Sequence, residues 1–334
     1  MPHEVMPGRE EFARSTEPFR RELLAHCYRM LGSLDEAEDL VQETYLRAWR
    51  SHDGFEGRSS LRVWLYRIAT NACLTALEQR GRRALPSGLG APSDDPAAPA
   101  VAGSEVSWLE PIPDALVTPP AEDPAAIVVS RESLRLSLIA CLQYLPARQR
   151  AVLILRDVLA FPATEVATML GTSTVAVKSA LQRARVRLEQ AAPAPDEISE
   201  PAEPEVRALL EAYIAAFENA DPAAMERVLR KDAALEPVGS RTWFAGRETC
   251  LGFIRQFLGS PGDWRMIATS ANGQPAAAAY LRGPDGTHRA FGIAVLTATR
   301  TGISRIVVFG DPGLVTRFGF PAVATLRAGS GSLR

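Results

Sequence analysis

The strongest constraint on the fold is a stretch in the middle of the chain, residues 86–130, which contains seven acidic residues, nine prolines and no basic residue. Proline lacks the amide hydrogen that helices and sheets use, and like charges repel one another. We therefore expect this stretch to pack poorly and to act as a linker. A second break rich in proline and acids covers residues 193–203. At about 150 residues per domain, the 334 residues allow two or three domains between these breaks.

Hydrophobic residues recur with regular spacing in three blocks, residues 1–85, 131–192 and 204–320. In the first two blocks the spacing is three to four residues, which is typical of amphipathic helices, and Ser33 with Glu36 forms a capping box. In the third block helices come first and four strands follow between Trp264 and Phe309, which indicates helices packed on an antiparallel sheet. We expect a flexible tail at residues 321–334. The predicted fold class is multidomain, with two all-α domains followed by an α+β domain.

Charge is distributed unevenly along the chain. The net charge is only −2, but residues 58–83 carry six arginines and one acid, with Trp64 and Tyr66 among them. Basic and aromatic residues together are typical of a nucleic-acid-binding surface. Because the WLYRIA run has the spacing of a packed helix face, we expect these two aromatic side chains to be partly in the core. Residues 35–43, in contrast, carry five acids and no base.

A second basic block runs from Lys178 to Arg187, and residues 161–190, which contain it, have the pattern of a helix-turn-helix. Ala167 allows two helices to approach closely, Gly171 permits the tight turn, and Val177 fixes the second helix against the first. An ordinary bundle with a solvated, charged helix is the alternative. The second helix is expected to present side chains that can contact base edges and phosphates: Ser173, Thr174, Lys178, Ser179, Gln182 and Arg183.

The sequence shows no pattern that indicates a membrane span or a metal-binding site. No uncharged apolar run approaches the roughly 18 residues that a membrane span needs, and the first residues carry acids where a secretory signal needs apolar residues. We therefore expect a cytoplasmic protein with no membrane partner. The four cysteines do not have zinc-site spacing, so we interpret them as small buried hydrophobic residues and expect no metal and no cofactor: Cys27, Cys73, Cys141 and Cys250.

Two long motifs resemble a known family. The run YRMLGSLDEAEDLVQETYLRAW, with the residues that follow it to position 80, resembles region two of the extracytoplasmic-function (ECF) sigma factors, which direct RNA polymerase to promoters. Residues 145–188 resemble region four of the same family. WLEPIPDAL, at 108–116, resembles a linker segment of the ECF groups that have an extra C-terminal domain. Residues 204–320 resemble the SnoaL-like, cone-shaped α+β domain of such groups, a curved antiparallel sheet with helices.

The resemblance implies a transcription-initiation factor. Such a factor binds core RNA polymerase through the beta-prime clamp and the beta flap, recognises and melts promoter DNA, and would be modulated in cis by its C-terminal domain. The resemblance also allows an anti-sigma factor as a partner. Because the polymerase performs the chemistry, we expect no catalytic residues in the sigma regions.

The resemblance also assigns the site residues. The polymerase-binding group lies on the acidic helix of region two: Asp39, Gln42, Glu43, Arg47 and Trp49. For Trp49, a buried position is an equal alternative. The group for the minus-ten promoter element comprises Phe55, Ser59, Arg62, Arg67 and Asn71. The group for the minus-thirty-five element comprises Arg156, Ser173, Thr174, Lys178, Ser179 and Arg183. Lysine at 178, where some relatives have arginine, cannot form a bidentate fork with a base.

The function of the C-terminal domain has two interpretations at this point. Its candidate pocket residues are Trp243, Asp263 and His288. Together with Glu236 and Asp311, the last two could form the acid–base group of a small-molecule cyclase or hydrolase, although surface positions fit these residues better. An operator-binding regulator that uses only the helix-turn-helix is a third interpretation of the whole chain, but it ignores the first block.

Overall fold

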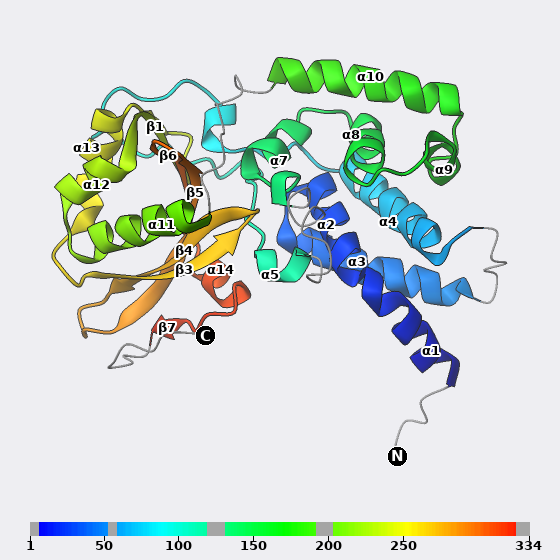
Figure 1. Ribbon diagram of the computed structural model, residues 1–334, viewed down its shortest axis with the longest axis horizontal. Coiled ribbons are helices and arrows are strands. Elements are labelled where there is room, and N and C mark those ends of the chain that lie inside the picture. Colours follow the sequence, from blue (N-terminus) through cyan, green and yellow to red (C-terminus); the bar gives the residue numbers. More distant parts are fainter. Residues whose placement is uncertain (1–6, 53–58, 119–130, 192–202, 325–334) are drawn as a thin grey trace. The chain divides into compact units, whose positions relative to one another are not determined.

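The computed structural model describes residues 7–52, 59–118, 131–191 and 203–324 (Figure 1). The chain forms two compact units, which we call the helical unit (Met1–Ala84 and Ser107–Asp196) and the C-terminal unit (Leu85–Val106 and Glu197–Arg334). Across the described ranges, no helix is both long and apolar enough to cross a membrane. The expected tail beyond Ala324 and the end of the expected first linker, residues 119–130, lie outside the described residues.

The first part of the helical unit is built from four helices. They are α1 (Pro7–Thr16), α2 (Arg20–Leu31), α3 (Leu34–Arg50) and α4 (Leu61–Glu78), with a short 3-10 turn, η1 (Glu17–Phe19), before α2. The core between them includes the fully buried side chains of Leu23, Tyr28, Leu65 and Tyr66. The side chain of Ser33 accepts a hydrogen bond from the amide of Glu36, which confirms the predicted start of α3.

The second part of the helical unit contains the predicted helix-turn-helix. Helices α7 (Leu136–Leu142) and α8 (Ala147–Leu153) are followed by a π-helical turn, η4 (Ile154–Val158). Helices α9 (Ala163–Met169) and α10 (Thr174–Ala191) form the motif itself. Gly171 lies in the turn with φ of 59°, which a residue with a side chain rarely adopts, and Val177 is buried as expected.

The C-terminal unit is a curved sheet with helices packed against it (Figure 1). Its helices are α11 (Glu203–Glu218), α12 (Pro222–Val228), α13 (Arg247–Leu258) and α14 (Pro312–Arg317). Its strands are β1 (Leu229–Val238), β2 (Phe244–Ala245), β3 (Trp264–Ala271), β4 (Gln274–Arg282), β5 (His288–Thr299), β6 (Gly302–Phe309) and β7 (Val323–Ala324). The strand order is β2-β1-β6-β5-β4-β3, and β7 pairs with β5. The expectation of a wholly antiparallel sheet is wrong in one place, because β1 and β6 run parallel.

A glycine accounts for part of the curvature. A Cβ atom on Gly292 would collide with the carbonyl oxygen of Phe309, so the strands approach more closely here than a larger residue allows. The register of β4 and β5 shifts beside this position, between Ala279 and Tyr280. Irregularities of this kind bend a sheet. The concave side that results faces α11 and α13.

The structure differs from the expected linker over residues 85–117. Residues 85–106, which we call the strap, pack on the C-terminal unit and include the 3-10 turn η3 (Pro86–Gly88). The chain then returns to the helical unit with Leu109 and Ile112 buried and forms α5 (Asp114–Val117). The two ends of the strap meet, because Ala84 donates an amide hydrogen bond to Ser107 and accepts one from Leu109.

Candidate nucleic-acid interface

The exposed face of α3 carries the residues expected to bind polymerase. Asp39, Gln42 and Arg47 are exposed, and Arg47 pairs with Glu43 at 2.7 Å, one helical turn away. Trp49 is 38% exposed and lies edge-on against Phe12, with ring centroids 5.4 Å apart. The buried alternative for Trp49 is therefore wrong.

Leu46 belongs to this face, although it was not among the expected polymerase-binding residues. It is 51% exposed, between the polar residues of the same helix. Apolar residues surrounded by polar ones are typical of protein-binding surfaces. The missed signal was the spacing itself, since Leu46 lies three residues after Glu43 and seven after Asp39, on the same side of the helix.

A polar pocket opens between the end of α3 and the middle of α4. Its lining includes two of the expected residues for the minus-ten element, Arg67 and Asn71. Trp64 forms part of the wall, and Arg50 and Ser51 were not predicted. Arg47 and Ile68 also line it, so three arginines contribute to one cavity of about 380 Å³. That combination of cations, an amide and an aromatic ring can hold an unstacked base and its phosphate.

The other residues expected to contact the minus-ten element are placed differently. Ser59 is exposed just before α4, and Phe55 lies outside the described residues. Arg62 donates two hydrogen bonds to the Glu22 carboxylate, at 2.8 and 2.9 Å. Its guanidinium also lies over the ring of Phe161, 4.6 Å from the centroid. Arg62 is therefore occupied inside the helical unit in this conformation.

Helix α10 presents the residues expected to read the minus-thirty-five element. Ser173 caps the helix by accepting a hydrogen bond from the Ala176 amide at 3.1 Å, and Lys178 is exposed one turn later. Thr174 is half-buried in the first turn. Arg183 donates a hydrogen bond to Ser179 at 2.6 Å, which orients both on one face.

Val175 is an exposed apolar residue on this face and was not among the expected DNA-binding residues. It is 74% exposed at the beginning of α10. In a helix-turn-helix the first residues of the second helix contact the bases, and an apolar side chain there can contact a thymine methyl group. Arg156, expected to contact the DNA backbone, is half-buried and donates a hydrogen bond to the Phe161 carbonyl.

A buried arginine joins the two parts of the helical unit. Arg150, on α8, donates hydrogen bonds to the Met30 carbonyl of α2 and, at 2.9 Å, to the Gln143 side chain. Its other terminal nitrogen is shared between the carbonyls of Gln143 and Leu145, both at 3.2 Å. Burial lowers the pKa of the Arg150 guanidinium to about 10. Tyr66 and Phe161 add a ring contact at 5.0 Å, so α4 and the helix-turn-helix are packed together.

The C-terminal unit holds the strap by a series of polar contacts. Ser87 donates its amide to the Glu236 carboxylate at 2.8 Å, and Trp243 donates its indole hydrogen to the Gly90 carbonyl at 2.9 Å. Glu236 also pairs with Arg305. Gln256 donates a hydrogen bond to the Pro96 carbonyl at 2.7 Å. Two of the residues expected to serve pocket chemistry, Glu236 and Trp243, therefore hold the strap.

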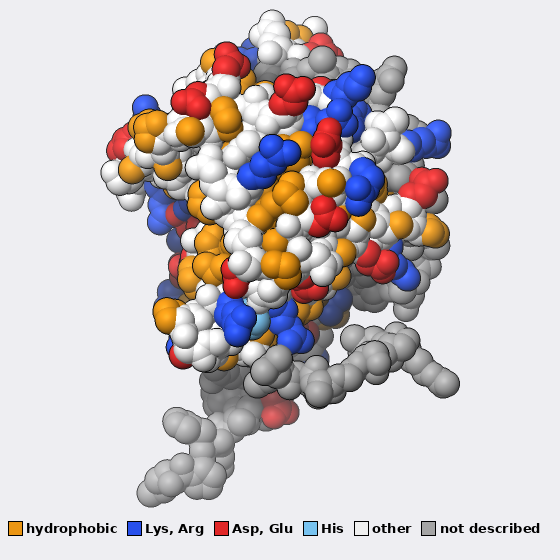
Figure 2. All heavy atoms as spheres, turned by 90° about the vertical axis from the view of Figure 1, so that its left-hand side faces the viewer, with side chains coloured by type: hydrophobic (Ala, Val, Ile, Leu, Met, Phe, Trp, Pro, Cys, Tyr) orange, Lys and Arg blue, Asp and Glu red, His pale blue; other side chains and the backbone are white. Residues whose placement is uncertain are grey.

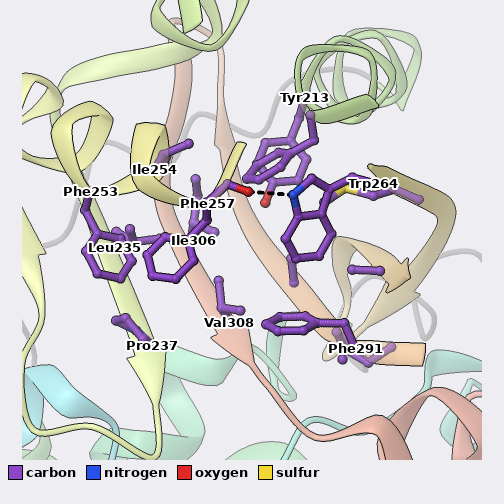
Figure 3. Close-up of a pocket in the computed structure, with 16 residues that line it drawn as sticks. Tyr213, Leu235, Pro237, Phe253, Ile254, Phe257, Trp264, Phe291, Ile306 and Val308 are labelled. Carbon is purple, nitrogen blue, oxygen red and sulfur yellow. Dashed lines mark hydrogen bonds between the residues drawn. The ribbon is translucent and has the colours of Figure 1, made fainter. Parts of the chain in front are cut away.

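The C-terminal unit also contains a cavity, between α11, α13 and the concave side of the sheet (Figure 3). None of the three expected pocket residues lines it. Trp243 contacts the strap, Asp263 accepts a hydrogen bond from the Ser260 amide at 2.7 Å, and the His288 ring lies 3.0 Å from the Gly262 carbonyl.

On the side of the C-terminal unit drawn in Figure 2, Lys and Arg alternate with Asp, Glu and hydrophobic side chains. This side therefore lacks the predominantly positive charge of a DNA-binding surface.

Comparison with known proteins identifies both parts of the helical unit. Residues 16–83 match the family Sigma-70 region 2, and residues 135–188 match Sigma-70, region 4. The chain is 53% identical to the ECF RNA polymerase sigma factor SigG of Mycobacterium tuberculosis (strain ATCC 25618 / H37Rv) over 316 residues, which cover 94% of this chain and 85% of that protein. It is 33% identical to SigJ of the same strain over 171 residues, 51% of this chain and 47% of that one.

One solved structure resembles the chain over most of its length. The crystal structure of the extracytoplasmic function sigma factor SigJ from Mycobacterium tuberculosis aligns with a TM-score of 0.58 and 23% sequence identity. The alignment covers 93% of this chain and 99% of that one. The likeness therefore includes the arrangement of two helical regions followed by an α+β domain.

Proposed function

Because the chain belongs to the extracytoplasmic-function RNA polymerase sigma factors, we propose that its two units divide the work of initiation. The helical unit binds polymerase and promoter DNA, and the C-terminal unit controls it through the strap. As a sigma factor, the protein is a transcription-initiation factor that partners core RNA polymerase and promoter DNA, and the polymerase supplies the chemistry.

The exposed face of α3 is the proposed polymerase contact. Leu46 and Trp49 supply the apolar centre, and Asp39, Gln42 and Arg47 supply a polar rim, which is the usual composition of a protein interface. We assign this face to the beta-prime clamp and the second part of the helical unit to the beta flap. An anti-sigma factor that covered the α3 face would compete with polymerase directly.

The pocket between α3 and α4 is the proposed site for a base of the melted minus-ten element. Melting takes a base out of the stack, and stacking and hydrogen bonds inside a pocket repay that cost. The amide nitrogen of Asn71 donates to the Arg67 carbonyl at 2.9 Å, so Asn71 pairs with a base edge through its amide oxygen, while Arg50 and Arg67 can neutralise the phosphates beside it. On α10, Lys178, Ser179 and Arg183 read the minus-thirty-five element as duplex DNA, with Val175 beside them.

The packed helical unit is the proposed resting conformation. Arg62 is held by Glu22 and by the Phe161 ring, and Arg150 ties α8 to α2. Contact with two separate promoter elements requires the two parts of this unit to move apart. The chain that connects them contains the strap.

Retention of the strap is the observation that carries the proposed regulation. Its 22 residues, 85–106, could extend the connection by about 70 Å if they were released. While Glu236, Trp243 and Gln256 hold the strap, its 22 residues cannot lengthen the chain segment that connects the two parts of the helical unit. We therefore assign the C-terminal unit an inhibitory role that is relieved when the strap is released.

The C-terminal unit has no enzymatic role in this proposal. General acid–base catalysis needs a group that titrates near neutral pH beside the substrate. The side chains that line the cavity among the described residues include no carboxylate, histidine or lysine. Asp263 and His288, which a cyclase or hydrolase would need, lie outside it.

Run-off transcription with purified core polymerase tests the proposal. The full chain, the chain ending at residue 203 and the double variant Glu236→Gln/Trp243→Phe would be compared over a titration of core enzyme. The proposal predicts promoter-dependent transcripts from all three, with more from the second and third. Asp232→Asn is the matched control, because Asp232 lies on the same strand but pairs with Arg230 rather than with the strap. Equal transcription from all proteins would refute the inhibitory role while leaving the sigma function intact.

A further inference from the structure

The cavity in the C-terminal unit has the size and lining of a binding site for one aromatic ring. Its volume is about 170 Å³, and its walls come from apolar side chains that include Phe217, Phe253, Trp264, Phe291 and Ile306 (Figure 3). An apolar cavity of about 150 Å³ in another protein is large enough to bind benzene. The ring of Phe291 meets that of Trp264 edge-on at 5.1 Å, an arrangement that suits further aromatic contacts.

One polar side chain in this lining has no partner. Tyr213 projects from α11 into the cavity and is only 1% exposed, and the described residues provide no hydrogen bond to its hydroxyl group (Figure 3). Burial raises the pKa of Tyr213, so the hydroxyl group stays protonated. The indole of Trp264, in contrast, is satisfied, because it donates to the Phe257 carbonyl at 2.7 Å. A ligand oxygen beside Tyr213 would give this hydroxyl group a hydrogen bond, which is worth about 1 kcal/mol.

We propose that the cavity binds a small uncharged molecule with one aromatic ring and one hydrogen-bonding oxygen. The ring packs among the aromatic side chains, and the oxygen pairs with the Tyr213 hydroxyl. A charged ligand is excluded, because no opposite charge lines the cavity within the described residues and burial of an unpaired ion is very costly. The site binds this molecule without converting it, since the lining holds no acid–base group.

Calorimetric titration of the full chain with phenol and with toluene tests this proposal. The two probes have nearly the same shape, but only phenol can pair with Tyr213. Both are expected to bind with dissociation constants on the order of 1 mM or below. In Tyr213→Phe, phenol binding should weaken by about fivefold, the usual worth of one hydrogen bond, while toluene binding stays within about twofold of the wild type.

Two further variants serve as controls for this titration. Tyr280→Phe is the matched control, because Tyr280 is equally buried but donates to the Pro321 carbonyl outside the cavity, and it should leave both titrations unchanged. Val308→Phe adds a ring at a half-buried position of the lining and should abolish binding of both probes. Absence of binding by the wild type, equal loss of both probes in Tyr213→Phe, or unchanged binding in Val308→Phe would overturn the proposal.

Discussion

Glu236 accepts a hydrogen bond from the amide of Ser87, 149 positions earlier in the chain, at 2.8 Å, and its side chain is fully buried. Its neighbours on β1, Leu235 and Pro237, line the cavity. Because side chains alternate across a strand, β1 carries the cavity on one side and the strap on the other. Helix α13 does the same, since Phe253 lines the cavity while Gln256 holds Pro96. A ligand that stiffened these two elements would also stiffen the grip on the strap.

Loss of the Glu236 charge is expected to loosen the strap. In Glu236→Gln, the charge-assisted hydrogen bond to Ser87 becomes a neutral one, which is weaker by about 1 kcal/mol. Amide hydrogen exchange of peptides spanning residues 85–93 should therefore quicken by about fivefold. Asp232→Asn makes the same chemical change on the same strand without contact to the strap, and should leave this exchange rate at the wild-type value. Equal protection in both variants would show that Glu236 does not hold the strap.

Arg150 is expected to be a major source of stability in the helical unit. Arg150→Met removes hydrogen bonds to Met30, Gln143 and Leu145, and leaves their buried oxygens unsatisfied. The free energy of unfolding should fall by about 3 kcal/mol. Urea unfolding measures this change. Arg148→Met, at an exposed position of the same helix, is the control and should change stability by less than about 0.5 kcal/mol.

Local patterns predicted most helices and strands, but contacts between distant segments could not be read from them. The capping box gave the start of α3, where Ser33 accepts a hydrogen bond from the Glu36 amide, whereas the similar cap of α10 by Ser173 was not predicted. Glu110 also binds the start of α3, at 2.9 Å from the Leu34 amide, from 76 positions later. No local pattern marks that contact, and the Glu36 side chain of the capping box pairs with Arg83 instead.

Composition was misleading for the strap. The prolines correctly indicated few amide donors and no regular secondary structure beyond a short turn. Their carbonyl oxygens nevertheless accept hydrogen bonds, Pro96 from Gln256 and Pro99 from Thr242, so a proline-rich segment can pack firmly where donors are supplied. The charge of Asp94 and Asp95 is no obstacle, because both lie at the surface.

The prediction of the pocket residues in the C-terminal unit was wrong for a related reason. The expected residues Asp263 and His288 are polar, whereas the cavity is lined by apolar residues such as Phe253 and Phe291. Core residues and the lining of an apolar cavity have the same hydrophobic pattern in a sequence. Only the three-dimensional arrangement distinguishes them.

Leu46 is expected to contribute to polymerase affinity without contributing to stability. Leu46→Ala should weaken binding of core polymerase by about fivefold, since we place Leu46 beside Trp49 at the centre of the interface, where the residues that contribute about 1 kcal/mol or more gather. Its unfolding free energy should stay within about 0.5 kcal/mol of the wild type. Fluorescence anisotropy of the labelled full chain with core enzyme measures the affinity. Val323→Ala, a similarly exposed truncation on the C-terminal unit, should have no effect on it.

His26 is expected to make the helical unit sensitive to acid. Burial lowers the pKa of His26 from 6.5 to about 3, so between these values the unfolded chain binds a proton that the folded chain does not. Stability is therefore full above pH 6.5 and falls as the pH drops, by about 2 kcal/mol between pH 7 and pH 5. His26→Gln keeps a partner for Thr70 but does not titrate, so it should lose about 2 kcal/mol less over the same interval.

Urea titrations with pulsed hydrogen exchange, read from peptides of α2 and α4, follow this part of the molecule separately from the C-terminal unit. A wild-type protein and a His26→Gln variant with parallel pH profiles would show that His26 is protonated in the folded state at pH 5.

The pocket at α4 and the face of α10 are expected to act at different steps of initiation. Asn71→Ala removes a group that can pair with an unstacked base, so strand opening should fall by about tenfold while duplex binding stays within about twofold. Lys178→Ala removes a phosphate or base contact from duplex DNA, so closed-complex binding should weaken by about fivefold. The slope of log binding constant against log salt concentration should decrease by about one.

Permanganate footprinting measures strand opening, and filter binding of holoenzyme to promoter duplex measures closed-complex binding. Gln190→Ala, exposed near the end of α10, is the control for both assays. If Asn71→Ala and Lys178→Ala reduced the two steps equally, the two surfaces would act as one unit, and the assignment of melting to the α4 pocket would have to be withdrawn.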